Sequence, residues 1–181
     1  MEIDVSLPSS LNTSTHPDSG HWNPPPMDRV KVNFDACFDP TRLHSISGIF
    51  IKNSEGKLLA ACTIPNLYVM NPEMVEALAC DQALILSLEL GLKRIEVEGD
   101  TLVVISKVVN PVINRSTLGT VYSNILEKRR NFDFLNFSHV YRINNNAAHV
   151  LVRVGKQNPQ VSVWFEEAPQ PVEETVMRDK G

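Results

Sequence analysis

The chain has 181 residues, of which 43% are hydrophobic, so it can bury the core of one domain of ordinary size. No window approaches the roughly 18 consecutive apolar residues of a transmembrane helix, and the N-terminal sequence MEIDVSLPSSLNTSTHPDSGH lacks the basic and apolar regions of a secretory signal. The net charge of −4 is uneven, because residues 28–158 have fifteen basic and thirteen acidic side chains while both flanking segments are acidic. The middle of the chain is therefore mildly basic, which permits phosphate binding without requiring it.

The three cysteines give no sign of a disulfide framework or of a metal site. Cys37, Cys62 and Cys80 are scattered along the chain and lack the spacing of metal ligands. We therefore expect reduced thiols and a soluble, intracellular protein, because disulfides are rare in reducing compartments.

Composition divides the chain into three parts. Residues 1–27 are rich in Ser, Thr, Asn and Pro and end in WNPPPM, which predicts a disordered leader. Residues 28–158 carry the periodic apolar patterns of a folded domain. Residues 159–181 hold an aromatic pair, several prolines and an excess of acid, which predict an acidic appendage packed on the domain.

Three strands are predicted first. The sequence VKVNFDACF, from residue 30, alternates apolar and polar side chains as a half-buried strand does. ISGIFIKN and KLLAACTI follow, joined by the glycine-containing turn NSEG. The short connections favour an antiparallel meander.

Helices and strands then alternate. Asn71 suits the N-cap of a long apolar helix, Pro72 its first position and Gly91 its end. KRIEVEG predicts a fourth strand, TLVVISKVVN and STLGTVYSNILEKRR two helices, FLNFSHVYR a fifth strand, and NNAAHVLVRVGK a final helix. The chain is thus predicted to be an α/β protein with a five-stranded mixed sheet in the order β-β-β-α-β-α-α-β-α.

Three acidic residues occupy informative positions in this order. Asp35 lies inside the first strand on the face away from the core, Glu76 lies one turn into the apolar helix, and Asp100 ends the fourth strand. Carboxylates that meet at such a place repel each other unless cations are bound between them. Hard oxygen ligands suit Mg²⁺ or Mn²⁺, and two such ions roughly 4 Å apart can activate a water for phosphodiester cleavage.

Each acid also has a purely structural interpretation. Asp100 can cap the helix that begins at Thr101, and Glu76 can be a first-turn acid favoured by the helix dipole. Asp35 has no capping duty in mid-strand. Glu73 is a rival to Glu76 one turn earlier, although it suits a solvated helix surface.

Four segments together resemble the ribonuclease H family. They are VNFDACF, SGIFIKNSEGKLLAA, VEALACDQALILSLELGLKRIEVEGDTLVVI and NNNAAHVLVRVG. More narrowly, with WNPPPMDRVKVNFD and VWFEEAPQ, the chain resembles plant ribonuclease H-like domains related to the C-terminal part of non-LTR retroelement reverse transcriptases. The resemblance spans roughly residues 22–170 and depends on the order and spacing of the motifs.

The resemblance implies a three-layer fold and an activity that hydrolyses the RNA strand of an RNA/DNA hybrid with two divalent metal ions. Its metal-binding positions fall on Asp35, Glu76 and Asp100, with Asp35 shared between both ions. The fourth position departs from the family, since many active members carry Asp there and this chain has His149, as the plant subgroup often does. A neutral imidazole supplies one nitrogen and no negative charge, and it suits Mn²⁺ better than Mg²⁺. His149 can be a ligand, a neighbour of the ligands, or a structural residue.

The sequence also offers few candidate residues for contacts to a substrate. Many active members place a His before the last helix, where this chain offers Arg142 or Asn145, and His139 within the strand is a weaker candidate. Of the basic loop that some members insert, only residues 127–130, EKRR, are present, and these can simply end a solvated helix. The candidates for contacts to the nucleic-acid backbone are Arg42, Lys52, Asn53, Arg142 and Asn145.

Two hypotheses from different classes follow. The first is a metal-dependent endonuclease that acts on RNA/DNA hybrids. The second is a catalytically degenerate, domesticated retroelement domain that binds nucleic acid or protein, which the His149 substitution, the short loop and the missing basic insertion favour. A third, a pure interaction domain that works through its tail, has less support.

Overall fold

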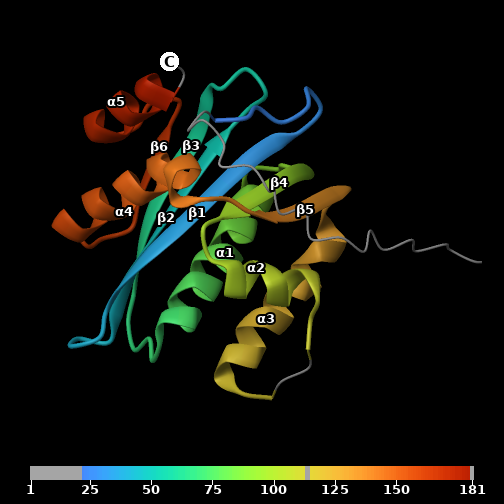
Figure 1. Ribbon diagram of the computed structural model, residues 1–181, viewed down its shortest axis with the longest axis vertical. Coiled ribbons are helices and arrows are strands. Elements are labelled where there is room, and N and C mark those ends of the chain that lie inside the picture. Colours follow the sequence, from blue (N-terminus) through green and yellow to red (C-terminus); the bar gives the residue numbers. More distant parts are fainter. Residues whose placement is uncertain (1–21, 113–114, 180–181) are drawn as a thin grey trace, which may run out of the picture.

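The computed structural model describes residues 22–112 and 115–179, and in this part of the chain six strands form one mixed sheet with helices on both faces (Figure 1). Across the sheet the strands follow the order β5-β4-β1-β2-β3-β6. The strands are β1 Val30–Asp39, β2 His44–Lys52, β3 Leu58–Asn66, β4 Arg94–Gly99, β5 Phe134–His139 and β6 Ser162–Phe165. The helices are α1 Pro72–Glu89, α2 Leu102–Val109, α3 Thr117–Lys128, α4 Asn146–Gln157 and α5 Gln170–Asp179, with short 3-10 turns η1 Arg129–Asn131 and η2 Arg142–Asn145.

The predicted α/β order is confirmed from β1 to α4. β1, β2 and β3 form the antiparallel meander; β4 pairs in parallel with β1, and β5 in parallel with β4, through helical crossovers. The N-terminus of α1 has the predicted cap, because the Asn71 side chain accepts a hydrogen bond from the Met74 amide at 2.9 Å. Gly91 follows the end of α1 with φ +72°, a conformation that glycine adopts without strain.

The prediction of five strands is wrong by one strand. Residues of the expected C-terminal appendage form β6, which pairs antiparallel with β3 along its free edge. The segment was missed because only four residues alternate, between residues rich in Pro and acid, and the pairing partner lies about a hundred residues away. α5 then packs against α4, with Val172 and Val176 buried.

Two helical layers enclose the sheet, as Figure 1 shows with α1, α2 and α3 on one side and α4 and α5 on the other. Successive residues of a strand point to opposite faces. Val32 and Phe34 of β1 therefore belong to the larger core under α1, while Asp35 points to α4. The smaller core, which includes Phe50 and Leu151, lies under α4 and α5.

Glycine lets α4 approach the sheet closely. A Cβ added at Gly48 on β2 would lie 2.9 Å from the Ala148 carbonyl oxygen and 2.7 Å from Val152 Cγ2. Gly48 pairs with Asp35 across the β1–β2 ladder. The close approach therefore brings the first turns of α4 directly over the middle of β1.

The segment before β1 lies against the same face of the sheet. Trp22 is partly buried, and its ring lies 4.6 Å from Lys52 Nζ and 5.7 Å from Lys31 Nζ, a cation–π arrangement. The Asn23 carbonyl accepts a hydrogen bond from Lys31 Nζ at 2.6 Å. Residues 1–21 of the expected leader lie outside the described residues.

None of the helices in residues 22–112 and 115–179 is both long enough and apolar enough to cross a membrane.

Candidate active site

The candidate site forms where the parallel pairing of β1 and β4 ends. The last paired residues are Phe34 and Gly99, so Asp35 is the first residue of β1 beyond the pairing and Asp100 the first beyond β4. Neighbouring strands lie about 4.8 Å apart, and the register therefore sets these two acids next to each other. Gly99 is required at this point, because an added Cβ would lie 2.5 Å from the Phe34 ring.

Glu76 reaches the same place from the second turn of α1, which packs on β1. Burial, followed by the negative charges of Asp35 and Asp100, raises the pKa of Glu76 to about 8. Burial and then the charge of Asp100 also raise the pKa of Asp35, whose side chain is fully buried. The three acids predicted from the sequence thus act on one another electrostatically, and we call Asp35, Glu76 and Asp100 the acidic cluster.

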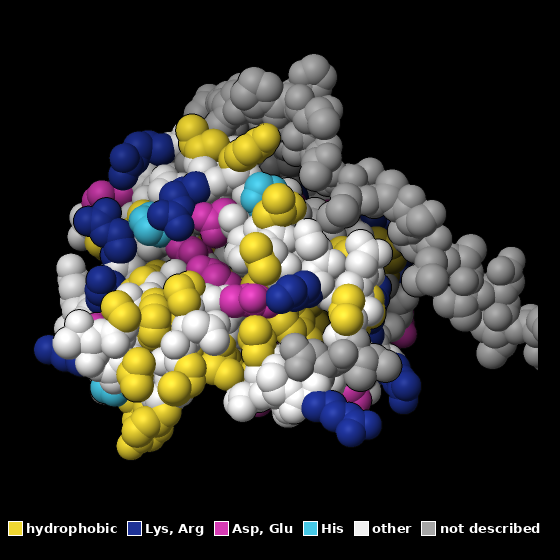
Figure 2. All heavy atoms as spheres, turned by 60° about the horizontal axis from the view of Figure 1, so that its bottom comes forward, with side chains coloured by type: hydrophobic (Ala, Val, Ile, Leu, Met, Phe, Trp, Pro, Cys, Tyr) yellow, Lys and Arg dark blue, Asp and Glu magenta, His cyan; other side chains and the backbone are white. Residues whose placement is uncertain are grey.

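One face of the molecule carries acidic side chains at its centre. Figure 2 shows a row of acidic side chains in a hollow at the middle of this face, with basic and histidine side chains beside it. A ligand that approaches this face meets negative charge at the centre and positive charge around it. Such a pattern suits a phosphate chain only when cations neutralise the centre.

His149 contacts the acidic cluster directly. Its Nδ1 lies 2.8 Å from Asp35 Oδ2, and the imidazole is partly exposed. An ionised Asp35 can only accept hydrogen bonds, so this geometry fits a proton on Nδ1 and leaves Nε2 toward other partners. The hydrogen bond lowers the pKa of Asp35 and so opposes part of the effect of burial.

Arg142 contacts the third acid. Its Nε donates to Asp100 Oδ2 at 2.9 Å, while the Asp100 side chain is mostly buried and that of Arg142 is 62% exposed. The N-cap position of α2 is Thr101, so the alternative in which Asp100 serves as the helix cap is not the arrangement seen. The guanidinium also opposes part of the rise in the pKa of Glu76 and thus brings positive charge to more than one member of the acidic cluster.

Asn145 holds the segment between Arg142 and His149 against β1. Its side chain is buried at 1% exposure, donates to the Phe34 carbonyl at 2.8 Å, and accepts from Asn33 Nδ2 at 3.2 Å. Asn145 therefore faces the sheet in this conformation and does not present its amide to a ligand. These hydrogen bonds attach Asn145, which precedes α4, to Phe34, the residue next to Asp35 on β1.

Sequence reasoning missed Asn33 and Glu98, which support Asn145. Asn33 also donates to Glu98 Oε2 at 3.2 Å, and Glu98 pairs with Lys31 at 2.7 Å. The alternation Lys31, Asn33, Asp35 on one face of β1 was the available signal, since three polar residues on a buried face require partners. The polar chain connects the segment before β1 to the residue adjacent to the acidic cluster.

The remaining predicted contacts differ in exposure. Arg42 lies at the β1–β2 turn, 76% exposed, with its Nη1 3.7 Å from Asp39 Oδ2. Lys52 is buried at 3% exposure beside the Trp22 ring, away from solvent. Asn53 shapes the β2–β3 turn, because its side chain accepts hydrogen bonds from the Glu55 and Lys57 amides.

The rival and weaker candidates have partners elsewhere. Burial acts to raise the pKa of Glu73, but hydrogen bonds from Lys107 and Tyr122 on neighbouring helices outweigh it and lower the pKa. His139 stacks edge-on against Tyr141, with ring centroids 5.8 Å apart. Residues 127–130 end α3 and form the start of η1.

The acidic cluster has the chemistry of a divalent-cation site, although its side chains do not yet form one. Among the residues that the structure describes, no three His, Cys, Asp or Glu side chains are arranged to hold a metal ion as they stand. Asp35 Oδ1 and Glu76 Oε2 are nevertheless buried without a hydrogen-bond partner in this part of the chain. Buried carboxylate oxygens without partners are costly, and hard oxygen donors are the ligands that Mg²⁺ and Mn²⁺ prefer. The donor set therefore fits such an ion.

A family model described as reverse transcriptase-like matches residues 33–155, more than half of the chain. The chain belongs to the reverse transcriptase-like family. The match begins two residues before Asp35 and ends inside α4, so it contains the whole acidic cluster and His149 and leaves β6 and α5 of this reverse transcriptase-like protein outside. No curated protein is significantly similar to the chain. The narrower resemblance to the plant subgroup stays a prediction.

Solved structures of ribonucleases H1 share the fold. RNase H1 from the halophilic archaeon Halobacterium salinarum is 21% identical with a TM-score of 0.66, over 72% of this chain and 98% of that protein. LC11-RNase H1, isolated from compost, is 20% identical in its complex with an RNA/DNA hybrid, with a TM-score of 0.61 over 69% of this chain and 94% of that protein. The reverse transcriptase-like domain therefore has the ribonuclease H fold.

The raised pKa of Glu76 predicts a characteristic dependence of stability on pH without divalent cations. Between pH 4.5 and about 8 the folded chain holds a proton on Glu76 that the unfolded chain releases. The free energy of unfolding should therefore fall as the pH rises through this window, by up to about 1.4 kcal/mol per pH unit from this group. Urea denaturation of the natural chain and of Glu76→Gln checks this, since the variant should lose that part of the slope. Glu89→Gln, at the exposed end of the same helix, is the control, and parallel curves for the natural chain and Glu76→Gln would contradict the prediction.

Proposed function

We propose that this chain is a ribonuclease H-type endonuclease that hydrolyses the RNA strand of RNA/DNA hybrids with two Mg²⁺ or Mn²⁺ ions. The observation that carries the proposal is the acidic cluster at the end of the β1–β4 pairing, with one unpartnered oxygen each on Asp35 and Glu76. The ribonuclease H fold supports it, and so does a related structure solved with an RNA/DNA hybrid.

The acidic cluster and His149 would hold the ions. Asp35 is central, because its Oδ2 contacts His149 while its carboxylate interacts electrostatically with Glu76 and Asp100. Glu76 and Asp100 would complete the site of the first ion, and the Nε2 of His149 is available near Asp35 for the second ion. When bound, the ions would activate a water and stabilise the leaving oxygen.

The chain's own residues would place the substrate. The buried side chains of Asn145 and Asn33 keep η2 and α4 against β1, so Asp35 and His149 are held in position before substrate binds. Arg142 is positively charged and exposed at the edge of the acidic cluster. It can turn from Asp100 to a phosphate of the substrate once a cation has neutralised the carboxylates.

The second candidate function is a catalytically degenerate, retroelement-derived domain that binds nucleic acid or protein without cleavage. The Arg142–Asp100 ion pair favours it, since a guanidinium already neutralises one of the three acids. His149 in place of a carboxylate lowers the negative charge further. The two candidates agree on the binding face and differ in whether divalent ions displace Arg142.

Cleavage of a labelled RNA/DNA hybrid separates the two candidates. The natural chain should cleave the RNA strand in Mn²⁺ and more slowly in Mg²⁺, because an imidazole ligand suits Mn²⁺ better. Asp35→Asn should abolish cleavage in both metals, and His149→Asp should raise the rate in Mg²⁺. Gel analysis of the labelled RNA measures these rates, with double-stranded DNA of the same sequence as the control substrate. Absence of cleavage by the natural chain in both metals would exclude the enzyme.

The position of Arg142 predicts that it competes with divalent ions for Asp100. Removal of an exposed ion pair, worth up to about 1 kcal/mol, should tighten Mn²⁺ binding roughly fivefold in Arg142→Gln. Titration of the melting temperature with Mn²⁺ measures the affinity. Arg42→Gln removes another exposed arginine, which pairs with Asp39, and should leave the affinity unchanged. Equal or weaker Mn²⁺ binding by Arg142→Gln would show that the guanidinium does not stand in the place of an ion.

A further inference from the structure

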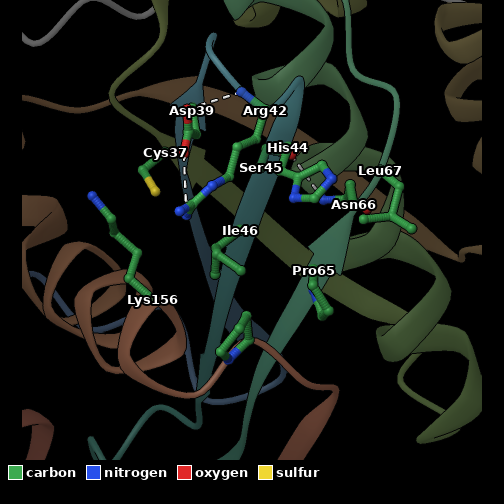
Figure 3. A pocket seen from close by; sticks show the side chains of 11 residues that line it. Cys37, Asp39, Arg42, His44, Ser45, Ile46, Pro65, Asn66, Leu67 and Lys156 are labelled. Atoms are coloured by element: carbon green, nitrogen blue, oxygen red, sulfur yellow. Dashed lines mark hydrogen bonds and ion pairs between the residues drawn. The ribbon is translucent and has the colours of Figure 1, made fainter.

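A pocket of about 270 Å³ lies further along β1 from the acidic cluster, and none of Asp35, Glu76, Asp100 or His149 lines it. It is formed by the end of the β1–β2 hairpin, the adjacent end of β3 and the C-terminal end of α4 (Figure 3). Ile46, Pro65 and Pro159 contribute apolar surface, whereas Arg42 and Lys156 contribute positive charge. A pocket with an apolar wall and cations at its rim suits an organic anion.

Both cationic side chains line this pocket together with Cys37. In Figure 3 the side chains of Arg42 and Lys156 extend toward Cys37. The positive charge of Lys156 opposes the rise that burial causes in the pKa of the Cys37 thiol, so the ammonium lies near the sulfur. Among the described residues that line the pocket, Asp39 is the one carboxylate; it lies 3.7 Å from Arg42 Nη1 and accepts hydrogen bonds from the amides of Thr41 at 3.0 Å and Arg42 at 3.2 Å. Asp39 thus shapes the turn and leaves the pocket with net positive charge.

Two elements lead from the acidic cluster to this pocket. Cys37 lies two residues beyond Asp35 on the same face of β1, a distance of about 7 Å at the rise of a strand. Lys156 lies seven residues beyond His149 on α4, about 10 Å along the helix. Because Asp35 contacts His149 and Cys37 lies near Lys156, β1 and α4 run side by side over this distance. The pocket therefore lies within a few nucleotides of the acidic cluster along a bound strand.

We propose that the pocket between the β1–β2 hairpin and α4 binds one nucleotide of the nucleic-acid strand that crosses the acidic cluster. Arg42 and Lys156 contact the phosphate, and the sugar and base lie against Ile46 and Pro65. The inference rests on the proposed function, which supplies a strand at the acidic cluster. It assigns the strand a second anchoring point in a chain whose middle helices carry only the short basic run at residues 127–130.

Cys37 provides a natural reporter for this pocket. The chain has three cysteines, of which Cys62 and Cys80 are buried and Cys37 is partly exposed. Burial also raises the pKa of Cys62 to about 11 and that of Cys80 further, so both thiols react slowly. Alkylation by iodoacetamide, followed by mass spectrometry of the peptides, therefore measures access to the pocket at Cys37.

The experiment uses the Asp35→Asn variant in Mg²⁺ with an RNA/DNA hybrid whose dissociation constant is first measured by fluorescence anisotropy. At about ten times that constant, occupancy of the pocket should slow alkylation of Cys37 roughly tenfold. Unchanged alkylation in the presence of bound hybrid would overturn the pocket proposal and leave the proposed function intact. Absence of hybrid binding in anisotropy would instead remove the proposed function, and the pocket proposal with it. Single-stranded RNA and single-stranded DNA as separate probes show which strand enters the pocket.

A double variant tests the cations independently of the thiol. Arg42→Gln with Lys156→Gln should weaken hybrid binding and reduce the slope of log affinity against log salt by about one to two, the mark of lost phosphate contacts. The control is Lys57→Gln, an exposed lysine at the β2–β3 turn that pairs with Glu55. A fold defect lowers the active fraction without changing the slope, so a slope equal to that of Lys57→Gln would overturn the assignment of Arg42 and Lys156.

Discussion

Buried negative charge at the end of the β1–β4 pairing is the constraint on which the site depends. Because β4 ends at Gly99, the edge of β1 that pairs with β4 is unpaired beyond Phe34. Asp35, Asp100 and Glu76 meet at this point. Three carboxylates in a mostly buried place repel one another and lose hydration, and the raised pKa values of Asp35 and Glu76 express that cost. Such an arrangement is stabilised by protons, by basic side chains or by bound cations, and Arg142 supplies a basic side chain to Asp100.

The surrounding structure keeps the acids together in spite of this repulsion. Gly48 permits α4 to lie directly on β2, which brings His149 over Asp35. Asn145 ties the start of the same helix to the Phe34 carbonyl, so that the residues at the acidic cluster are fixed from both sides. A site that is expensive to assemble and yet rigidly supported is typical of function, because strain and electrostatic cost are retained where they serve binding or chemistry.

The sequence predicted the domain's element order and the acidic cluster because both follow from local patterns. Strand alternation, the Asn71 cap and the apolar helix set the topology, and the topology placed Asp35, Glu76 and Asp100 together. Other features depend on partners far along the chain. The pairing of β6 with β3, the burial of Lys52 beside Trp22 and the bonds of Asn145 join residues between 30 and about 110 positions apart. A local pattern shows that such residues need partners and does not show which ones they find.

The most direct test of this account is the location of manganese in crystals of the natural chain. Anomalous scattering from crystals grown with Mn²⁺ should give a peak about 2.0–2.2 Å from Asp35 Oδ1 and Glu76 Oε2, with Asp100 released from Arg142. A crystal with Mn²⁺ bound only elsewhere, or with no peak and the Arg142–Asp100 and His149–Asp35 contacts unchanged, would contradict it.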